Sequence, residues 1–152
     1  MLAVLFSIGD DRYGLPAAEV FEITPVLKLK QIPAAPDYVA GLCNFRGKPM
    51  PVLDLSALAR GVPCRPLLST RMIVVNYVLD NGGVKPLGLL AERATETAFI
   101  DEADLQRPGI QAEGAPYLGK VTVRSGELVQ LVEVEEMLTP EAAALLFREA
   151  PA

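Results

Sequence analysis

Few residues in this chain have the chemical types that catalysis requires. The sequence contains no histidine, which excludes serine triads, cysteine–histidine pairs and histidine metal sites. Cys43 lies three residues before Arg46, and a nearby arginine can lower the pKa of a thiol. One open hypothesis is therefore a small β-barrel enzyme or ligand-binding protein that uses Cys43 and Arg46. The alternative is that Cys43 is a buried structural thiol.

The carboxylates and glycines add no second catalytic signal. Asp10 and Asp11 fall at a predicted turn, and residues 101–104 match the acidic start of a helix. The acids in residues 133–136 are typical of a solvated face. The sequence has no phosphate-binding glycine loop, no dinucleotide fingerprint and no cluster with metal-ligand spacing. These observations favour a protein that is not an enzyme and that uses no cofactor or metal.

Composition narrows the class of protein further. Of the 152 residues, 51% are hydrophobic, so the chain can bury a sizeable core, and 13 prolines with 12 glycines favour turns over long helices. The formal net charge is -5 without any run of basic residues, so we do not expect nucleic acid as a partner. No apolar segment reaches the roughly 18 residues of a membrane span. We expect a cytoplasmic protein with no direct membrane insertion, in which Cys43 and Cys64 are free thiols.

Strand signals dominate the chain, and turn signals divide the strands into hairpins. Asn81-Gly82 is a strong two-residue hairpin signal, and Ser125-Gly126 separates two further strand segments. Thr139 followed by Pro140 marks the start of a helix. We predict strands within 2–16, 22–25, 27–33, 38–55, 71–100 and 120–134, short helical turns near 16–21, 56–70 and 101–109, and a helix over 139–150.

Two patterns occur twice, in the same order along the chain. FSIGDDRYGLP (6–16) is echoed by NYVLDNGGVKPLG (76–88), and RGKPMPVLDLSAL (46–58) is echoed by SGELVQLVEVEEML (125–138). The similarity indicates an internal duplication. We therefore predict two small barrel-like β units, about 1–65 and about 66–138, followed by a helix over about 139–150.

The segment GLCNFRGKPMPVLDL (41–55) places a polar tip between two apolar strands. Arg46 is exposed by its position at this tip. Arginine carries a rigid fork of donors and is enriched in interface hot spots, and Phe45 beside it offers an apolar anchor. On these local grounds, Arg46 is either a solvated turn residue or part of a protein interface.

The same segment resembles the signature hairpin of the CheW family, the scaffold proteins of bacterial chemosensory arrays. The resemblance extends over nearly the whole chain, through residues 6–23, 69–75, 87–96 and 117–138. It implies a mostly all-β fold of two intertwined SH3-like five-stranded β-barrels with short helical turns and a C-terminal α-helix, in one domain over 1–152. The residues of the signature that this chain keeps are Gly41, Asn44, Arg46, Gly47, Pro51, Val52, Asp54 and Leu55, with Phe45 in place of leucine.

The resemblance also implies a function. Proteins of this family are non-catalytic adaptors that couple a methyl-accepting chemoreceptor to the regulatory domain of a CheA-type histidine kinase, and they are recruited to membrane-associated receptor arrays. The positions that match partner-binding places of the family are Val20, Glu22, Gly41, Arg46, Lys48, Ala94 and Thr97. The positions expected to set the turn and the structural motif are Asn44, Gly47, Pro51 and Asp54.

Three positions depart from the family pattern. Ala94 and Thr97 stand where valines are common, and Ser56 follows the VLDL segment where arginine is frequent. These departures favour an accessory array over the main flagellar one, with a surface-sensing pathway of the Wsp type as an example.

Overall fold

The structure is a computed structural model that describes residues 1–110 and 113–147. Its strands are β1 (Leu2–Ile8), β2 (Asp11–Pro16), β3 (Val20–Thr24), β4 (Val39–Phe45), β5 (Lys48–Asp54), β6 (Arg71–Val78), β7 (Val84–Phe99), β8 (Leu118–Arg124) and β9 (Glu127–Val132). Two short α-helices, α1 (Leu55–Arg60) and α2 (Pro140–Leu146), and the 3-10 turns η1 (Ala17–Glu19), η2 (Glu102–Asp104) and η3 (Val134–Glu136) connect or follow them. The chain is mostly β, as predicted.

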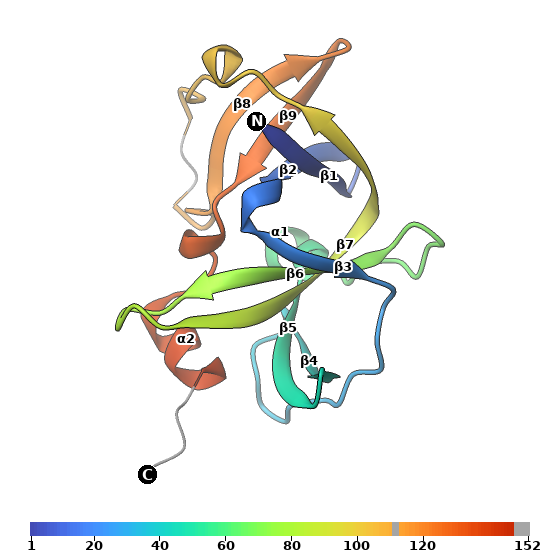
Figure 1. Cartoon of the computed structure of the whole chain (residues 1–152), viewed down its shortest axis with the longest axis vertical. Helices are drawn as coiled ribbons and strands as arrows, with labels where there is room; N and C mark the ends of the chain where they lie inside the picture. Colours follow the sequence, from blue (N-terminus) through green and yellow to red (C-terminus); the bar gives the residue numbers. More distant parts are fainter. Residues whose placement is uncertain (111–112, 148–152) are drawn as a thin grey trace.

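Two five-stranded sheets share the long strand β7 (Figure 1). Sheet A has the order β7–β1–β2–β9–β8, and sheet B has the order β3–β6–β7–β5–β4. Most neighbours are antiparallel, but β2 runs parallel to β9 and β5 runs parallel to β7. Each sheet forms one SH3-like barrel of the expected fold.

The internal duplication is visible in the strand pairing. In sheet A, the β1–β2 hairpin runs parallel to the β8–β9 hairpin through the pairing of β2 with β9. In sheet B, the hairpin of β6 and the first half of β7 runs parallel to the β4–β5 hairpin through the pairing of β7 with β5. The β1–β2 hairpin therefore corresponds to β6–β7, and the β8–β9 hairpin corresponds to β4–β5. The first hairpin of each repeat therefore pairs with strands of the other repeat. Each sheet therefore contains strands from both repeats, and the two sheets do not coincide with residues 1–65 and 66–138. The repeats in the sequence show which segments are similar, but they do not show which segments pair.

The strand β7 changes sheets at Arg93. It pairs with β6 as far as Ala91 and with β1 from Glu92 onward. Arg93 lies in the left-handed region with φ 49°, which is uncommon for a residue other than glycine. The guanidinium of Arg12 donates to the carbonyl oxygen of Arg93 at 3.2 Å and to Ser7 Oγ at 3.0 Å. These bonds hold the strand at the point where it bends.

A common hydrophobic core joins the two sheets. Its buried members come from sheet A and sheet B alike, and examples are Val4, Phe6, Leu15, Leu53, Ile73 and Leu87. A smaller cluster lies within sheet B around Cys43, Met50, Val52 and Met72, and another lies within sheet A around Leu5, Ile100 and Val129. Because most of the buried apolar area is shared, neither sheet has an independent core of comparable size.

Most predicted elements are present, with two differences. The expected strand over 27–33 is wrong: only Lys30 forms a bridge there, opposite Leu42, while Leu27 and Leu29 pack against the cluster in sheet B. The expected helix over 139–150 begins as predicted, with the Thr139 hydroxyl accepting from Ala142 N, but α2 ends at Leu146. Residues 148–150 lie outside the described part. Within that part, no helix combines the length and hydrophobicity that crossing a bilayer requires.

The loop 61–70 lies along β7, where Cys64 contacts Leu90 and Ser69 accepts from Ala94 N, and it is anchored by Glu92. The Glu92 side chain is only 1% exposed, and it accepts hydrogen bonds from Arg65 N at 2.9 Å, Nε at 3.0 Å and Nη2 at 2.8 Å. Burial alone raises the pKa of this carboxyl, but the hydrogen bonds and charge of Arg65 outweigh the burial and hold the pKa below its ordinary value. Glu92 therefore stays ionised and fixes the loop.

We expect Glu92→Gln to lower the free energy of unfolding at neutral pH by about 2 kcal/mol, because it removes the charge from hydrogen bonds to a guanidinium. The folded pKa lies below the unfolded value of about 4.3, so the carboxylate stabilises the native state above about pH 4.3 and less as pH falls through the folded pKa. Urea unfolding from about pH 7 to about pH 3 should therefore show the gap between wild type and variant closing in acid. A gap independent of pH would contradict this account.

Candidate functional site

The tip of the β4–β5 hairpin is a two-residue turn formed by Arg46 and Gly47. Both residues have positive φ, 53° and 85°, which is the pattern of a type I′ hairpin turn. The Asn44 Oδ1 atom accepts a hydrogen bond from Gly47 N at 2.8 Å. Asn44 and Gly47 thus take part in the turn that presents Arg46.

Three side chains surround the guanidinium of Arg46. Its Nη2 atom lies 3.2 Å from Glu22 Oε1 on β3. Its Cζ atom lies 5.0 Å from the ring centroid of Phe21 and 5.3 Å from that of Phe45. The two rings meet edge to face, with centroids 6.1 Å apart at 76°. We call this group the Arg46 cluster (Phe21, Glu22, Phe45 and Arg46). The side chain of Arg46 is 62% exposed and Phe21 is half exposed, whereas Phe45 is buried beneath them.

A β-bulge brings Phe21 and Glu22 to the same arginine. In the pairing of β3 with β6, Val20 lies opposite Val75 and Glu22 lies opposite Val74, so Phe21 is an extra residue. Bulges change the direction of side chains, and they are common at sheet edges, where β3 lies. The phenylalanine is half exposed as a result. Sequence reasoning missed Phe21, because a bulge leaves no local signature in a segment such as VFEI.

Some residues expected at a partner surface are accessible. Val20 is half-buried and Glu22 is partly exposed on β3, while Lys48 is exposed beside the tip. Thr97 is also exposed, but it lies on β7 in sheet A, opposite Val4 of β1. The structure thus brings Glu22 to Arg46 and leaves Thr97 on the other sheet.

Two other expected partner contacts are inside the molecule. Ala94 is buried in the common core. Gly41 is buried, has φ 146°, and a Cβ atom built there would lie 2.4 Å from the carbonyl oxygen of Lys30. Neither residue is available at the surface, and each has a packing role instead.

The remaining motif residues are structural. Asp54 is the N-cap of α1, where its Oδ1 atom accepts from Ala57 N at 3.0 Å and its Oδ2 atom accepts from Cys64 N at 2.9 Å. Pro51 is buried in β5 opposite Leu42. The strand β5 is not an edge strand, because it pairs with β4 on one side and with β7 on the other. Its prolines are tolerated because they precede Val52, where the pairing with β7 starts.

The two thiols do not form a reactive site with Arg46. Cys43 is buried in the cluster of sheet B, and burial raises the pKa of its thiol. Burial, with the negative charge of Asp54 nearby, raises the pKa of Cys64 to about 12. A protonated, buried thiol is a poor nucleophile. In the part of the chain that the structure describes, no group of three or more Cys, Asp or Glu side chains is placed to hold a metal ion.

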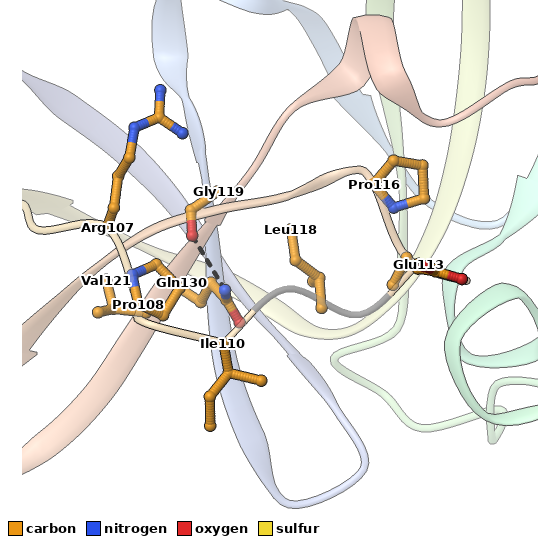
Figure 2. Close-up of a pocket in the computed structure, with 10 residues that line it drawn as sticks. Arg107, Pro108, Ile110, Glu113, Pro116, Leu118, Gly119, Val121 and Gln130 are labelled. Carbon is orange, nitrogen blue, oxygen red and sulfur yellow. Dashed lines mark hydrogen bonds between the residues drawn. The ribbon is translucent and has the colours of Figure 1, made fainter.

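A separate hollow of about 510 Å³ lies beside β8 (Figure 2). Its only charged lining residues among those described, Arg107 and Glu113, lie at opposite sides in Figure 2, and Gln130 Nε2 donates to the carbonyl oxygen of Gly119 at 2.9 Å. Apolar side chains such as Ile110, Leu118 and Val121 form the rest of the lining. The described lining includes no residue of the Arg46 cluster, so the hollow is a separate feature.

Comparisons with known proteins identify the family. The family model described as "CheW-like domain" matches residues 2–142. The chemotaxis protein CheW of Treponema pallidum is 25% identical over 138 residues, which cover 90% of this chain and 81% of the relative. The chemotaxis protein CheW of Helicobacter pylori is 28% identical over 135 residues, covering 88% of this chain and 78% of the relative.

A solved structure has the same fold. The scaffolding protein TtCheW from Thermoanaerobacter tengcongensis superposes with a TM-score of 0.79 at 24% identity, over 93% of this chain and 89% of that one. The family match, the relatives and the fold agree with the resemblance found in the signature hairpin. The chain belongs to the CheW-like domain family.

Proposed function

We propose that this chain is a non-catalytic adaptor that couples a methyl-accepting chemoreceptor to a CheA-type histidine kinase in a chemosensory array. The observation that carries the proposal is the arginine presented at the tip of the signature hairpin of a CheW-like chain, with its side chain 62% exposed. The adaptor acts in the cytoplasm and is recruited to receptors at the membrane.

The Arg46 cluster is the surface that we assign to the regulatory domain of the kinase. Arginine is common in interface hot spots because its planar fork forms several directed hydrogen bonds. The turn at Asn44 and Gly47 and the contact with Glu22 hold this fork in place before a partner arrives. A side chain that is already ordered loses less entropy on binding.

An adaptor needs a second surface, and we assign it to an apolar hollow beside the loop 61–70. The hollow has a volume of about 380 Å³, and Val26, Leu67 and Leu90 contribute to its lining. Leu68 at its rim is 98% exposed, although its carbonyl oxygen accepts from Arg71 and the loop is anchored on Glu92. An amphipathic receptor helix can place its apolar face in such a groove.

A three-component retention experiment tests the adaptor. The receptor tip fragment is immobilised, and the kinase regulatory domain is added with or without this chain. We expect retention of the kinase domain only when the chain is present.

Leu68→Glu should weaken binding of the chain to the receptor at least about tenfold, because it places a charge in an apolar contact. Its binding of the kinase domain in solution should stay unchanged. The matched control Leu145→Glu alters an exposed leucine on α2 and should behave as wild type. If the wild-type chain binds neither partner, the adaptor proposal is wrong.

A further inference from the structure

Of the two rings in the Arg46 cluster, Phe45 is buried in the core of sheet B, whereas Phe21 is half exposed and adds little to that core. Phe21 is 50% exposed on an edge strand, where burial of its ring contributes only part of the usual hydrophobic stabilisation. The ion pair of Arg46 with Glu22 is solvent-exposed, and such pairs stabilise a fold little. The contact of Phe21 with Arg46 and Glu22 therefore contributes little to the stability of the fold, which points to a role in binding.

We propose that Phe21 is a specificity-determining residue, which fixes the orientation of Arg46 and provides the apolar half of the contact with the partner. The proposal rests on the proposed function, because it concerns the partner of the same surface. The bulge at Phe21 places its ring at the guanidinium, and Phe45 provides the second ring. Two rings and one carboxylate restrict a side chain that would otherwise sample many rotamers.

The chemistry of the partner follows from what the cluster leaves exposed. The ring of Phe21 lies near the guanidinium of Arg46, and Glu22 accepts a hydrogen bond from its Nη2 atom. The other N–H groups of the guanidinium are the ones available to a ligand. The exposed part of Phe21 and the side chain of Ile23 lie on the same short strand, and both are exposed. The complementary surface is an apolar side chain with a carboxylate beside it, because the carboxylate can accept from the free edge of Arg46 while the apolar group covers Phe21.

A double-mutant cycle on binding to the kinase regulatory domain tests the proposal. Calorimetric titrations compare the wild-type chain with Phe21→Gln, Arg46→Ala and the double variant. We expect Phe21→Gln to weaken binding about tenfold, and the double variant to lose clearly less than the product of the two single effects, because part of the effect of Phe21 passes through the arginine. Phe21→Tyr keeps an aromatic face and should bind within about twofold of wild type.

Controls separate specificity from folding and from the adaptor proposal itself. Phe99→Gln changes a phenylalanine that is also exposed, at 75%, but lies in sheet A, and it should not alter binding. Urea unfolding should give similar midpoints for all variants. If wild type binds and Phe21→Gln binds equally well, or if the effects of Phe21 and Arg46 multiply independently, the specificity role is wrong and the adaptor role stands. If wild type does not bind the kinase domain, the proposed function is wrong and the specificity role falls with it.

Discussion

Replacing Arg46 by glutamate is expected to weaken binding of the kinase regulatory domain at least about 100-fold while the chain stays folded. The substitution removes the donor fork from the Arg46 cluster and places a second carboxylate beside Glu22, so the surface becomes repulsive to an acidic contact. The stability should fall by only about 1 kcal/mol, because the ion pair and most of the Arg46 side chain are exposed to solvent. Calorimetric titration measures the binding, and circular dichroism with urea unfolding measures the fold.

Lys120→Glu is the matched control for this charge reversal. Lys120 is exposed on β8 in sheet A, and the change alters the net charge by the same amount. We expect it to bind the kinase domain as wild type does, apart from a small effect of the overall charge that salt screens. Equal loss of binding in both variants would show that net charge, not the arginine, determines the interaction. An unfolded Arg46→Glu chain would instead make Arg46 a structural residue.

Gly41→Ala should destabilise the fold more than any surface substitution, by about 4 kcal/mol. Two costs combine: strain at φ 146° and overpacking, since the new Cβ atom would lie 2.4 Å from the carbonyl oxygen of Lys30. Relief requires β4 to move away from Lys30, and that would break the hydrogen bonds from Lys30 N to Leu42 O and from Leu42 N to Lys30 O, of 2.7 and 2.8 Å. Urea unfolding at neutral pH measures the change.

Gly82→Ala separates the two costs. Gly82 also has a positive φ, 85°, but a Cβ atom there would meet nothing within 4 Å. Its substitution should cost only about 1 kcal/mol of backbone strain. Equal destabilisation at both positions would mean that the contact with Lys30 is unimportant. The comparison also separates folding from binding, because a chain unfolded by a change at Gly41 loses its partners indirectly.

Local sequence signals predicted the hairpins well. Gly82, Ser125 and Gly126 have positive φ, a conformation that few residues adopt, so both turns could be recognised without any long-range information. At the first of them the connection is the longer segment 79–83 and not the two-residue turn that Asn81-Gly82 suggests, because the last strand pair is Val78 with Val84. The segment 27–33 shows the opposite case. The apolar residues of its alternating pattern, Leu27 and Leu29, pack against sheet B. The segment nevertheless pairs with another strand only at Lys30, so it is not a strand. Periodicity reports which side of a segment is buried, and it does not report whether a neighbouring strand is present.

The sequence singled out Arg46 and its turn residues as a candidate site, but it gave no indication of Phe21. The turn formed with Asn44 and Gly47 presents Arg46, and all three residues lie within four consecutive positions of the sequence. Phe21 joins them only because a bulge in β3 and the closure of sheet B bring distant segments together. Gly41 and Ala94 were expected at a partner surface by resemblance alone, whereas their burial depends on packing that a motif does not encode.

The exchange of hairpins between the two repeats has a consequence for the order of synthesis. The β1–β2 hairpin leaves the ribosome first, yet it pairs with the second half of β7 and with β9, which are made late. Until then, side chains such as Leu5 and Phe6, which are buried in the finished protein, have no partner strands to cover them. Folding must therefore wait for nearly the whole chain, and long-range pairing of this kind is slow. A nascent chain that stalls before β9 would expose an apolar hairpin to aggregation and to chaperones.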